Sequence, residues 1–361
     1  MLKAIALRSY PELDTIRFIS IFLVVLHHQF LFQNIFLTWL GTYGWVGVDI
    51  FFVLSGFLIT NLLKAEFKKT SGINLKKFWF KRMLRLWPSW LFTQIITIVI
   101  IYYLSRNDSP LRTELINKFW HYLLHFGNYS HAYLGKIHTL YGHFWSLAVE
   151  EHFYLIWPLL LIFILKKPKL TNGLLVSLLL IPYAFRVFYA LNEVPHSVIK
   201  FSTHTRFDEL IWGCMLALNF EKMPNLSAKL EAVLTVLMFV LFYLGLQVLE
   251  TSPSVFLSQI NFTFIGIASC ILVWIATKGS QNGLRKILQI SIFSKLGILS
   301  YGVYLIHNIT NLISFGLIKH IYPGINHNLI AILNFSLPFL PAFLMYKFID
   351  QKFEVFKNRI S

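Results

Sequence analysis

Apolar stretches about as long as a membrane is thick recur along the whole chain. In a bilayer, about 20 predominantly apolar residues span the hydrocarbon core as a helix. An α-helix satisfies every backbone amide and carbonyl within the segment, as the lipid environment requires. Ten such stretches lie at about residues 15–34, 44–63, 87–104, 145–165, 173–191, 206–220, 231–249, 260–277, 297–317 and 328–349. The sequence therefore predicts an all-α fold, a polytopic integral membrane helical bundle of about ten transmembrane helices.

The composition argues against a soluble globular enzyme. Hydrophobic residues make up 56% of the chain and charged residues only 13%, whereas soluble domains carry roughly 25% charged residues. An aromatic content of 17% also excludes a disordered chain. The two cysteines, Cys214 and Cys270, lie in apolar stretches and predict neither a disulfide framework nor a zinc site.

The net charge of +16 indicates membrane topology rather than a nucleic-acid partner. Of the 32 Lys and Arg residues, 23 fall in the N-terminus, the even-numbered connections and the C-terminal tail, and 6 in the odd-numbered connections. Because basic residues accumulate on the cytoplasmic side, both termini are predicted to be cytoplasmic. The first apolar stretch holds Arg17, His27 and His28 and lacks a small-residue cleavage site, so it is predicted to remain as a membrane helix.

No internal repeat and no Pro/Gly/Ser-rich linker divides the chain. Residues 1–361 are therefore predicted to form a single membrane domain with no appended soluble domain. The longest connection, about 105–144, faces outward in this topology, and its aromatic residues predict a helix lying in the membrane interface. Its histidines lack a tight repeated spacing, which favours interfacial packing or carbohydrate contact over a metal site. They are His121, His125, His131, His138 and His143.

Carboxylates are concentrated where the bilayer makes them costly. Among those that lie in or at the ends of apolar stretches are Asp14, Asp49, Glu150, Glu151, Asp208 and Glu209. Ionisable groups inside a membrane are candidates for function by default.

The first stretch carries Arg17 and His28 on nearly the same helical face, about 16 Å apart along the axis. Arg17 then marks the cytoplasmic end, while His28 lies beyond the middle of the membrane. Histidine is the side chain best suited to accept and return a proton near neutral pH. The alternative is a structural histidine bonded to a neighbouring helix, a role for which His27 on another face is the natural candidate.

Two arginines, Arg82 and Arg85, precede Trp87-Pro88 at the cytoplasmic end of the third stretch. At i and i+3 on a helix they present two guanidinium groups side by side, a geometry suited to phosphate. The alternative is a basic anchor that contacts lipid headgroups.

The fourth stretch opens with a polar stripe of Ser146, Glu150 and Tyr154 on one helical face. A hydrolase triad is not expected there, because no G-x-S-x-G turn accompanies the serine. Glu150 and Glu151 are adjacent, so only one of them can face a given pocket. Two further polar segments, 47–56 and 300–307, contain small residues that favour close helix packing, but Asp49 and His307 exceed what packing needs.

Six blocks of this sequence, taken in order, resemble acyltransferase family 3, which comprises membrane O-acyltransferases of bacterial surface carbohydrates. The blocks are Leu13-Asp14-x-x-Arg17 with His28, the Gly47–Gly56 segment, Arg82-x-x-Arg85 before Trp87-Pro88, the Phe144–Tyr154 segment, Arg206-Phe207-Asp208, and the Leu299–His307 segment. Each block alone is weak, but six in sequence over most of the chain are specific. His152 stands where relatives commonly have Gln.

The resemblance implies transfer of an acyl group, usually acetyl from acetyl-CoA and without a metal, to a hydroxyl of a lipid-linked or extracytoplasmic glycan such as lipopolysaccharide O-antigen. It implies a bacterial cytoplasmic membrane location, with His28 as proton acceptor paired with Arg17. By the same analogy, Arg82 and Arg85 hold the CoA phosphates. Glu150 is the further catalytic candidate. The other candidate site residues are Asp14, Asp49, Ser146, Glu151, Arg206, Asp208, Tyr301 and His307. Many relatives add an extracytoplasmic domain that completes transfer, so this chain is expected to act alone or with a separate partner protein.

Two other classes of membrane protein remain as alternatives. A transporter or flippase of a glycan or lipid precursor would share the spans and buried charge, but would show repeated halves and broken helices. A sensor or scaffold would not need ionisable groups inside the bilayer.

Overall fold

The computed structural model describes residues 10–29, 35–104, 109–133, 139–314, 319–322 and 327–359. These residues form helices joined by turns, and no strand occurs among them. Seven of the described helices are long and apolar enough to cross a membrane, or eight if one bent pair is counted as a single span. The predicted all-α polytopic membrane protein is therefore confirmed.

The ten predicted spans exceed the eight found by length and composition because two of the predicted spans are shorter helices. The seven long spans are Val46–Thr70, Leu75–Tyr103, Leu140–Lys166, Pro168–Leu191, Ala228–Val248, Val255–Lys278 and Ile332–Lys357, and the bent pair is Ser291–Ile298 with Ser300–Ile313. The two remaining predicted spans correspond to α1 (Pro11–His27) and α11 (Thr203–Asn219), each of 17 residues. A described helix lies at each of the ten predicted positions, but the number of ten membrane crossings remains a prediction.

The helices group into two compact units, each assembled from separate chain segments. Unit 1 comprises residues 1–20, 46–73 and 152–298. It holds the first half of α1 and most of α8 (Trp145–Lys166). Its complete helices are α3 (Val46–Thr70), α9 (Thr171–Leu191), α10 (His196–Phe201), α11, α12 (Ala228–Tyr243), α13 (Val255–Gln259), α14 (Asn261–Lys278), α15 (Leu284–Leu288) and α16 (Ser291–Ile298). Three short helical turns, η1 (Pro168–Leu170), η2 (Phe220–Lys222) and η3 (Leu244–Leu249), complete the unit.

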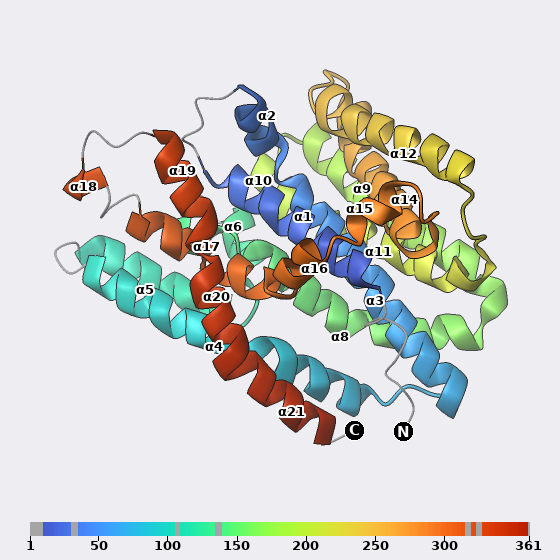
Figure 1. The fold of residues 1–361 in the computed structure, drawn as a ribbon, viewed down its shortest axis with the longest axis horizontal. Helices are drawn as coiled ribbons and strands as arrows, with labels where there is room; N and C mark the ends of the chain where they lie inside the picture. The colour runs from blue at the N-terminus through green and yellow to red at the C-terminus, as the bar shows by residue number, and fades with distance from the viewer. Residues whose placement is uncertain are drawn as a thin grey trace. The chain divides into compact units, whose positions relative to one another are not determined.

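The core of unit 1 is the close packing of α3 against α11 (Figure 1). A Cβ atom added at Gly213 would lie 1.9 Å from the Val53 carbonyl oxygen, and one at Gly56 would lie 2.0 Å from the Leu210 carbonyl oxygen. Both positions therefore require glycine for backbone contact. This confirms the packing role predicted for Gly56 from the small residues of the 47–56 segment.

Unit 2 comprises residues 21–45, 74–151 and 299–361. Its elements are α2 (Ile35–Tyr43), α4 (Leu75–Leu104), α5 (Ser109–Leu123), α6 (Gly127–Tyr133), α7 (Thr139–Gly142), the start of α8, α17 (Ser300–Ile313), α18 (Lys319–Ile321), α19 (His327–Ser336), α20 (Phe339–Met345), η5 (Tyr346–Asp350) and α21 (Gln351–Arg359).

Helix α4 organises unit 2, where it packs against α5, α17 and α21 (Figure 1). Its buried face carries a row of polar side chains, Ser89, Thr93, Gln94 and Thr97. The Thr93 and Thr97 hydroxyls donate to backbone carbonyls one turn earlier, so they need no partner on another helix. The outward connection predicted at 105–144 forms α5, α6 and α7, which confirms helix in that segment.

Candidate active site

Three histidines meet inside unit 2. His28 directly follows α1, His143 lies in the turn after α7, and His307 is on α17. The ring centroids of His28 and His307 are 4.9 Å apart, those of His143 and His307 are 4.7 Å apart, and those of His28 and His143 are 6.5 Å apart. His143 and His307 are buried, whereas His28 is half-buried. We call these residues the histidine trio.

Backbone carbonyls fix the tautomer of each ring, because a carbonyl can only accept a hydrogen bond. His28 Nδ1 lies 2.8 Å from the Val24 oxygen and His307 Nδ1 lies 2.8 Å from the Tyr304 oxygen, so both Nδ1 atoms carry the proton. His307 Nε2 then accepts from His28 Nδ1 at 3.3 Å. His28 Nε2 has no hydrogen bond among the described residues. A half-buried ring nitrogen with a free lone pair is the arrangement that a general base needs.

His143 takes the opposite tautomer and closes the trio. Its Nε2 donates to the Leu305 oxygen at 3.4 Å, and its Nδ1 accepts from the Asn308 amide at 2.9 Å. Sequence reasoning placed His143 among the outward histidines and missed its role here, because the contact with His307 depends on tertiary packing.

The predicted stripe on α8 is anchored to α17 by hydroxyl groups. The Tyr304 hydroxyl donates to the His143 carbonyl oxygen, and the Ser146 hydroxyl donates to Tyr304 at 2.6 Å. Ser146 is thus held by a tyrosine rather than by a histidine, so the geometry lacks a serine nucleophile activated by a base. Glu150, one turn after Ser146, is half-buried and acts electrostatically on the Tyr304 side chain.

Arg82 and Arg85 lie on one continuous helix, as predicted, and each is close to a carboxylate. Glu151 interacts electrostatically with Arg82 and with the indole of Trp87. Arg85 is exposed and acts electrostatically on Asp350, which accepts from the Ser89 hydroxyl at 2.5 Å.

Tyr301 belongs to the same region of unit 2. Its hydroxyl donates to the Leu86 carbonyl oxygen at 2.8 Å, directly after Arg85 in the chain. The contact fixes the start of α17 against α4 beside the two arginines.

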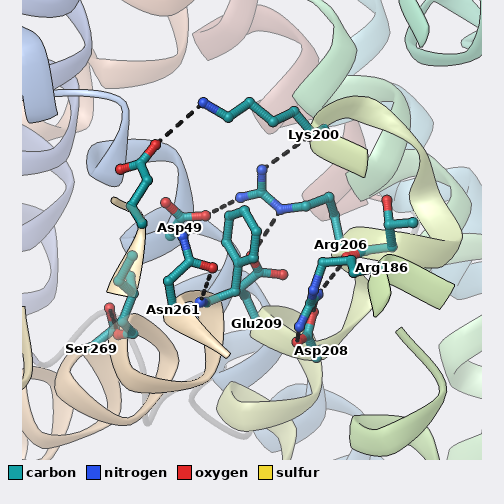
Figure 2. A network of polar contacts seen from close by, with 12 residues as sticks. Asp49, Arg186, Lys200, Arg206, Asp208, Glu209, Asn261 and Ser269 are labelled. Atoms are coloured by element: carbon teal, nitrogen blue, oxygen red, sulfur yellow. Dashed lines mark hydrogen bonds and ion pairs between the residues drawn. The ribbon is translucent and has the colours of Figure 1, made fainter. Parts of the chain in front are cut away.

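A second polar site lies in unit 1, where three of the candidate residues join one buried ion network (Figure 2). Arg206 pairs with Asp49, with Glu209 at 2.9 Å, and with the Lys200 carbonyl oxygen at 3.0 Å. Asp208 accepts two hydrogen bonds from Arg186, at 2.7 and 3.0 Å.

The Arg186 guanidinium is fully buried and makes two further bonds, to the carbonyl oxygens of Thr205 and Gln259. The Phe262 ring lies 4.2 Å from the Arg206 guanidinium and 4.9 Å from that of Arg186. The network therefore joins α3, α9, α11 and α14. Arg186 was not among the predicted site residues, although a lone arginine inside an apolar stretch signals a buried carboxylate partner.

Asp14 and Arg17 form an ion pair with each other on α1, three residues apart. The backbone of Asp14 also contacts Gly297, where an added Cβ would lie 1.8 Å from the Asp14 carbonyl oxygen. The functional pairing of Arg17 with His28 remains a prediction.

Comparison with known proteins agrees with the six sequence blocks. Residues 10–347 match the profile of the acyltransferase domain of acyltransferase family 3. Three curated relatives are each 30% identical: the peptidoglycan O-acetyltransferase OatA of Listeria monocytogenes over 95% of this chain and 56% of its own length, the O-acetyltransferase OatA of Staphylococcus aureus over 83% and 50%, and the putative peptidoglycan O-acetyltransferase YrhL of Bacillus subtilis over 83% and 48%.

The chain thus spans about half the length of these relatives. No solved structure matches it significantly. Because the family profile covers almost the whole chain, this protein belongs to acyltransferase family 3.

Proposed function

We propose that this protein is a membrane O-acyltransferase that moves an acetyl group from acetyl-CoA to a hydroxyl of an envelope glycan. The observation that carries the proposal is the free Nε2 of His28, whose ring is held by bonds from its other nitrogen to Val24 and His307. Family membership adds the reaction class.

The chemistry follows from this tautomer. His28 Nε2 takes the proton of the acceptor hydroxyl while the hydroxyl oxygen attacks the thioester carbonyl carbon. The new C–O bond forms, the C–S bond breaks, and the CoA thiolate leaves with the proton returned by His28. As His28 becomes positively charged, its Nδ1–H donates more strongly to His307 Nε2. His307 is therefore a positioning residue for the base.

Peptidoglycan is the acceptor to test first, because two of the relatives are named for it. Lipopolysaccharide O-antigen, the acceptor class that the family resemblance suggested, is the second. Both offer secondary and primary sugar hydroxyls to the same base.

The orientation proposed with this function places Lys64 to Arg85 and both termini in the cytoplasm, on the 23 to 6 distribution of basic residues. Lys69 is exposed at the end of α3 and Asn117 is exposed on α5. In intact cells, Lys69→Cys should resist an impermeant thiol reagent and Asn117→Cys should react. The unsubstituted chain is the control, since Cys214 is buried and Cys270 partly so. The reverse labelling pattern would invert the proposed donor side.

The donor site is proposed at Arg82 and Arg85. With the full chain reconstituted in lipid nanodiscs, acetyl-labelled acetyl-CoA should transfer base-labile label to purified peptidoglycan glycan strands and release one CoA thiol for each acetyl group.

Arg82→Lys and Arg85→Lys keep the charge but lose the planar two-pronged geometry. Since hydrogen bonds to charged groups contribute roughly 1.5–3 kcal/mol, the KM for acetyl-CoA should rise about tenfold or more in each variant.

Lys77→Gln is the matched control, because it removes a whole charge from an exposed position on the same helix. It should leave that KM unchanged. If the arginine variants also leave it unchanged, both residues are lipid anchors. If neither peptidoglycan nor O-antigen acquires label and no CoA is released, the acyltransferase proposal is wrong.

A further inference from the structure

Several side chains in unit 2 carry buried polar atoms without a hydrogen-bond partner in the part of the chain that the structure describes, and four of these side chains lie on α4, α5 and α7. These are Trp90 Nε1, both amide atoms of Gln94, and the hydroxyls of Tyr122 and Tyr141. Each residue is at most 2% exposed. We call these four residues the α4–α7 polar cluster. Trp90 and Gln94 lie one turn apart on the buried face of α4, Tyr122 is on α5, and Tyr141 is on α7.

Ring contacts join this cluster to the histidine trio. The Tyr122 and Tyr141 rings are stacked, with centroids 4.5 Å apart. The centroid of the Phe144 ring lies 4.7 Å from that of Trp90 and 6.5 Å from that of Tyr122. The centroid of the Phe144 ring also lies 3.9 Å from that of His143, a member of the trio. The polar cluster and the proposed base are therefore parts of one continuous region of unit 2.

Unpaired polar groups in such a position are costly and call for an explanation. Burying a hydroxyl or amide without a partner loses its hydrogen bonds to water, and an apolar side chain of the same shape would avoid that loss. Phenylalanine could keep the Tyr122–Tyr141 stack, and leucine or methionine could fill the place of Gln94. Four such groups in one region are better explained by a ligand that supplies their partners.

The chemistry of these groups indicates the class of ligand. None of the four carries a charge, so they do not suit the phosphates of CoA. Tyrosine hydroxyls and the glutamine amide both donate and accept, and the indole N–H donates. A neutral ligand with closely spaced hydroxyl and acetamido groups matches this set, which is the chemistry of an N-acetylated sugar.

We propose that the α4–α7 polar cluster binds the sugar ring of the acceptor glycan and presents its hydroxyl toward the histidine trio. The proposal rests on the proposed function for the identity of the reaction, but the binding itself can be measured without turnover. It assigns the acceptor to unit 2, the same unit that holds His28.

The test uses the full chain in nanodiscs and a soluble β-1,4-linked oligosaccharide of N-acetylglucosamine as the probe. Tyr122→Phe and Tyr141→Phe each remove one hydroxyl and keep the ring. We expect the dissociation constant of the oligosaccharide, measured by calorimetric titration, to rise about tenfold in each variant. The unliganded variants should melt at the same temperature as the wild type or higher, because an unpaired buried hydroxyl has been removed. A purely structural hydroxyl would instead lower the melting temperature and leave binding unchanged.

Tyr243→Phe, on an exposed position of α12, is the matched control and should change neither quantity. Gln94→Leu gives an independent measurement on another helix and should also weaken binding. The proposal is overturned if the wild-type chain does not bind the oligosaccharide, or if all three cluster variants bind it as tightly as the wild type. Failure of acetyl transfer with binding intact would overturn the proposed function and leave the sugar site standing.

Discussion

His28→Gln should abolish acetyl transfer to the glycan while leaving a folded, membrane-inserted protein. Glutamine keeps much of the size and some hydrogen bonding of histidine, but it has no nitrogen that can accept a proton. General-base catalysis supplies about 10²–10⁴-fold in rate, so kcat should fall by that factor or more. The measurement is label transfer from acetyl-CoA at equal amounts of reconstituted protein.

Two further substitutions separate catalysis from packing. His320→Gln replaces an exposed histidine of unit 2 and should retain full activity. His307→Gln should give an intermediate loss in kcat, because its side-chain oxygen can still accept from His28 Nδ1 while the ring packing is changed. A His28→Gln protein with near wild-type transfer would make His28 a structural residue and move the search for the base to Glu150, Asp208 or His307.

Arg186→Met should cause the largest loss of stability of any single change in unit 1. It leaves the fully buried Asp208 carboxylate without its two hydrogen bonds from the guanidinium group. Removing one partner of a buried ion pair costs about 3–5 kcal/mol. We expect a large drop in melting temperature in detergent and a reduced yield of membrane-inserted protein.

The double variant Arg186→Met with Asp208→Leu tests whether this pair is structural. Replacing both members with apolar groups removes the uncompensated charge and should recover most of the lost stability. If the recovered protein also acetylates its acceptor, the pair serves only to hold α9 against α11. A double variant that is stable but inactive would show that the charges take part in catalysis, as the place of Asp208 among the candidate residues suggested.

Much of the fold could be predicted because the membrane imposes a length on each helix. The apolar stretches located α3, α4, α8, α9, α12 and α14. They did not reveal the breaks inside the two stretches nearest the C-terminus, 297–317 and 328–349. The stretch predicted at 328–349 is interrupted by a turn at Leu337 and Pro338, since proline cannot donate the helical hydrogen bond. The stretch predicted at 297–317 divides at Leu299 into α16 and α17.

The sequence predicted the candidate site less completely than the fold, because only some of its residues stand out from their neighbours in the chain. His28 and His307 could be singled out because each is a polar residue within an apolar pattern. His143 follows a polar connection and shows no such contrast, so only packing reveals its contact with His307. Gln94, Tyr122 and Tyr141 were missed because their polar atoms are unusual only once their burial and lack of partners are known.

The close spacing of the histidine trio limits how many protons the site can hold. A second positive charge 4.9 Å from a protonated His28 would cost roughly 3 kcal/mol at an effective dielectric constant of 20. If His28 is the base that we propose, the trio therefore holds one proton at a time, the proton taken from the acceptor hydroxyl and returned to the leaving thiolate.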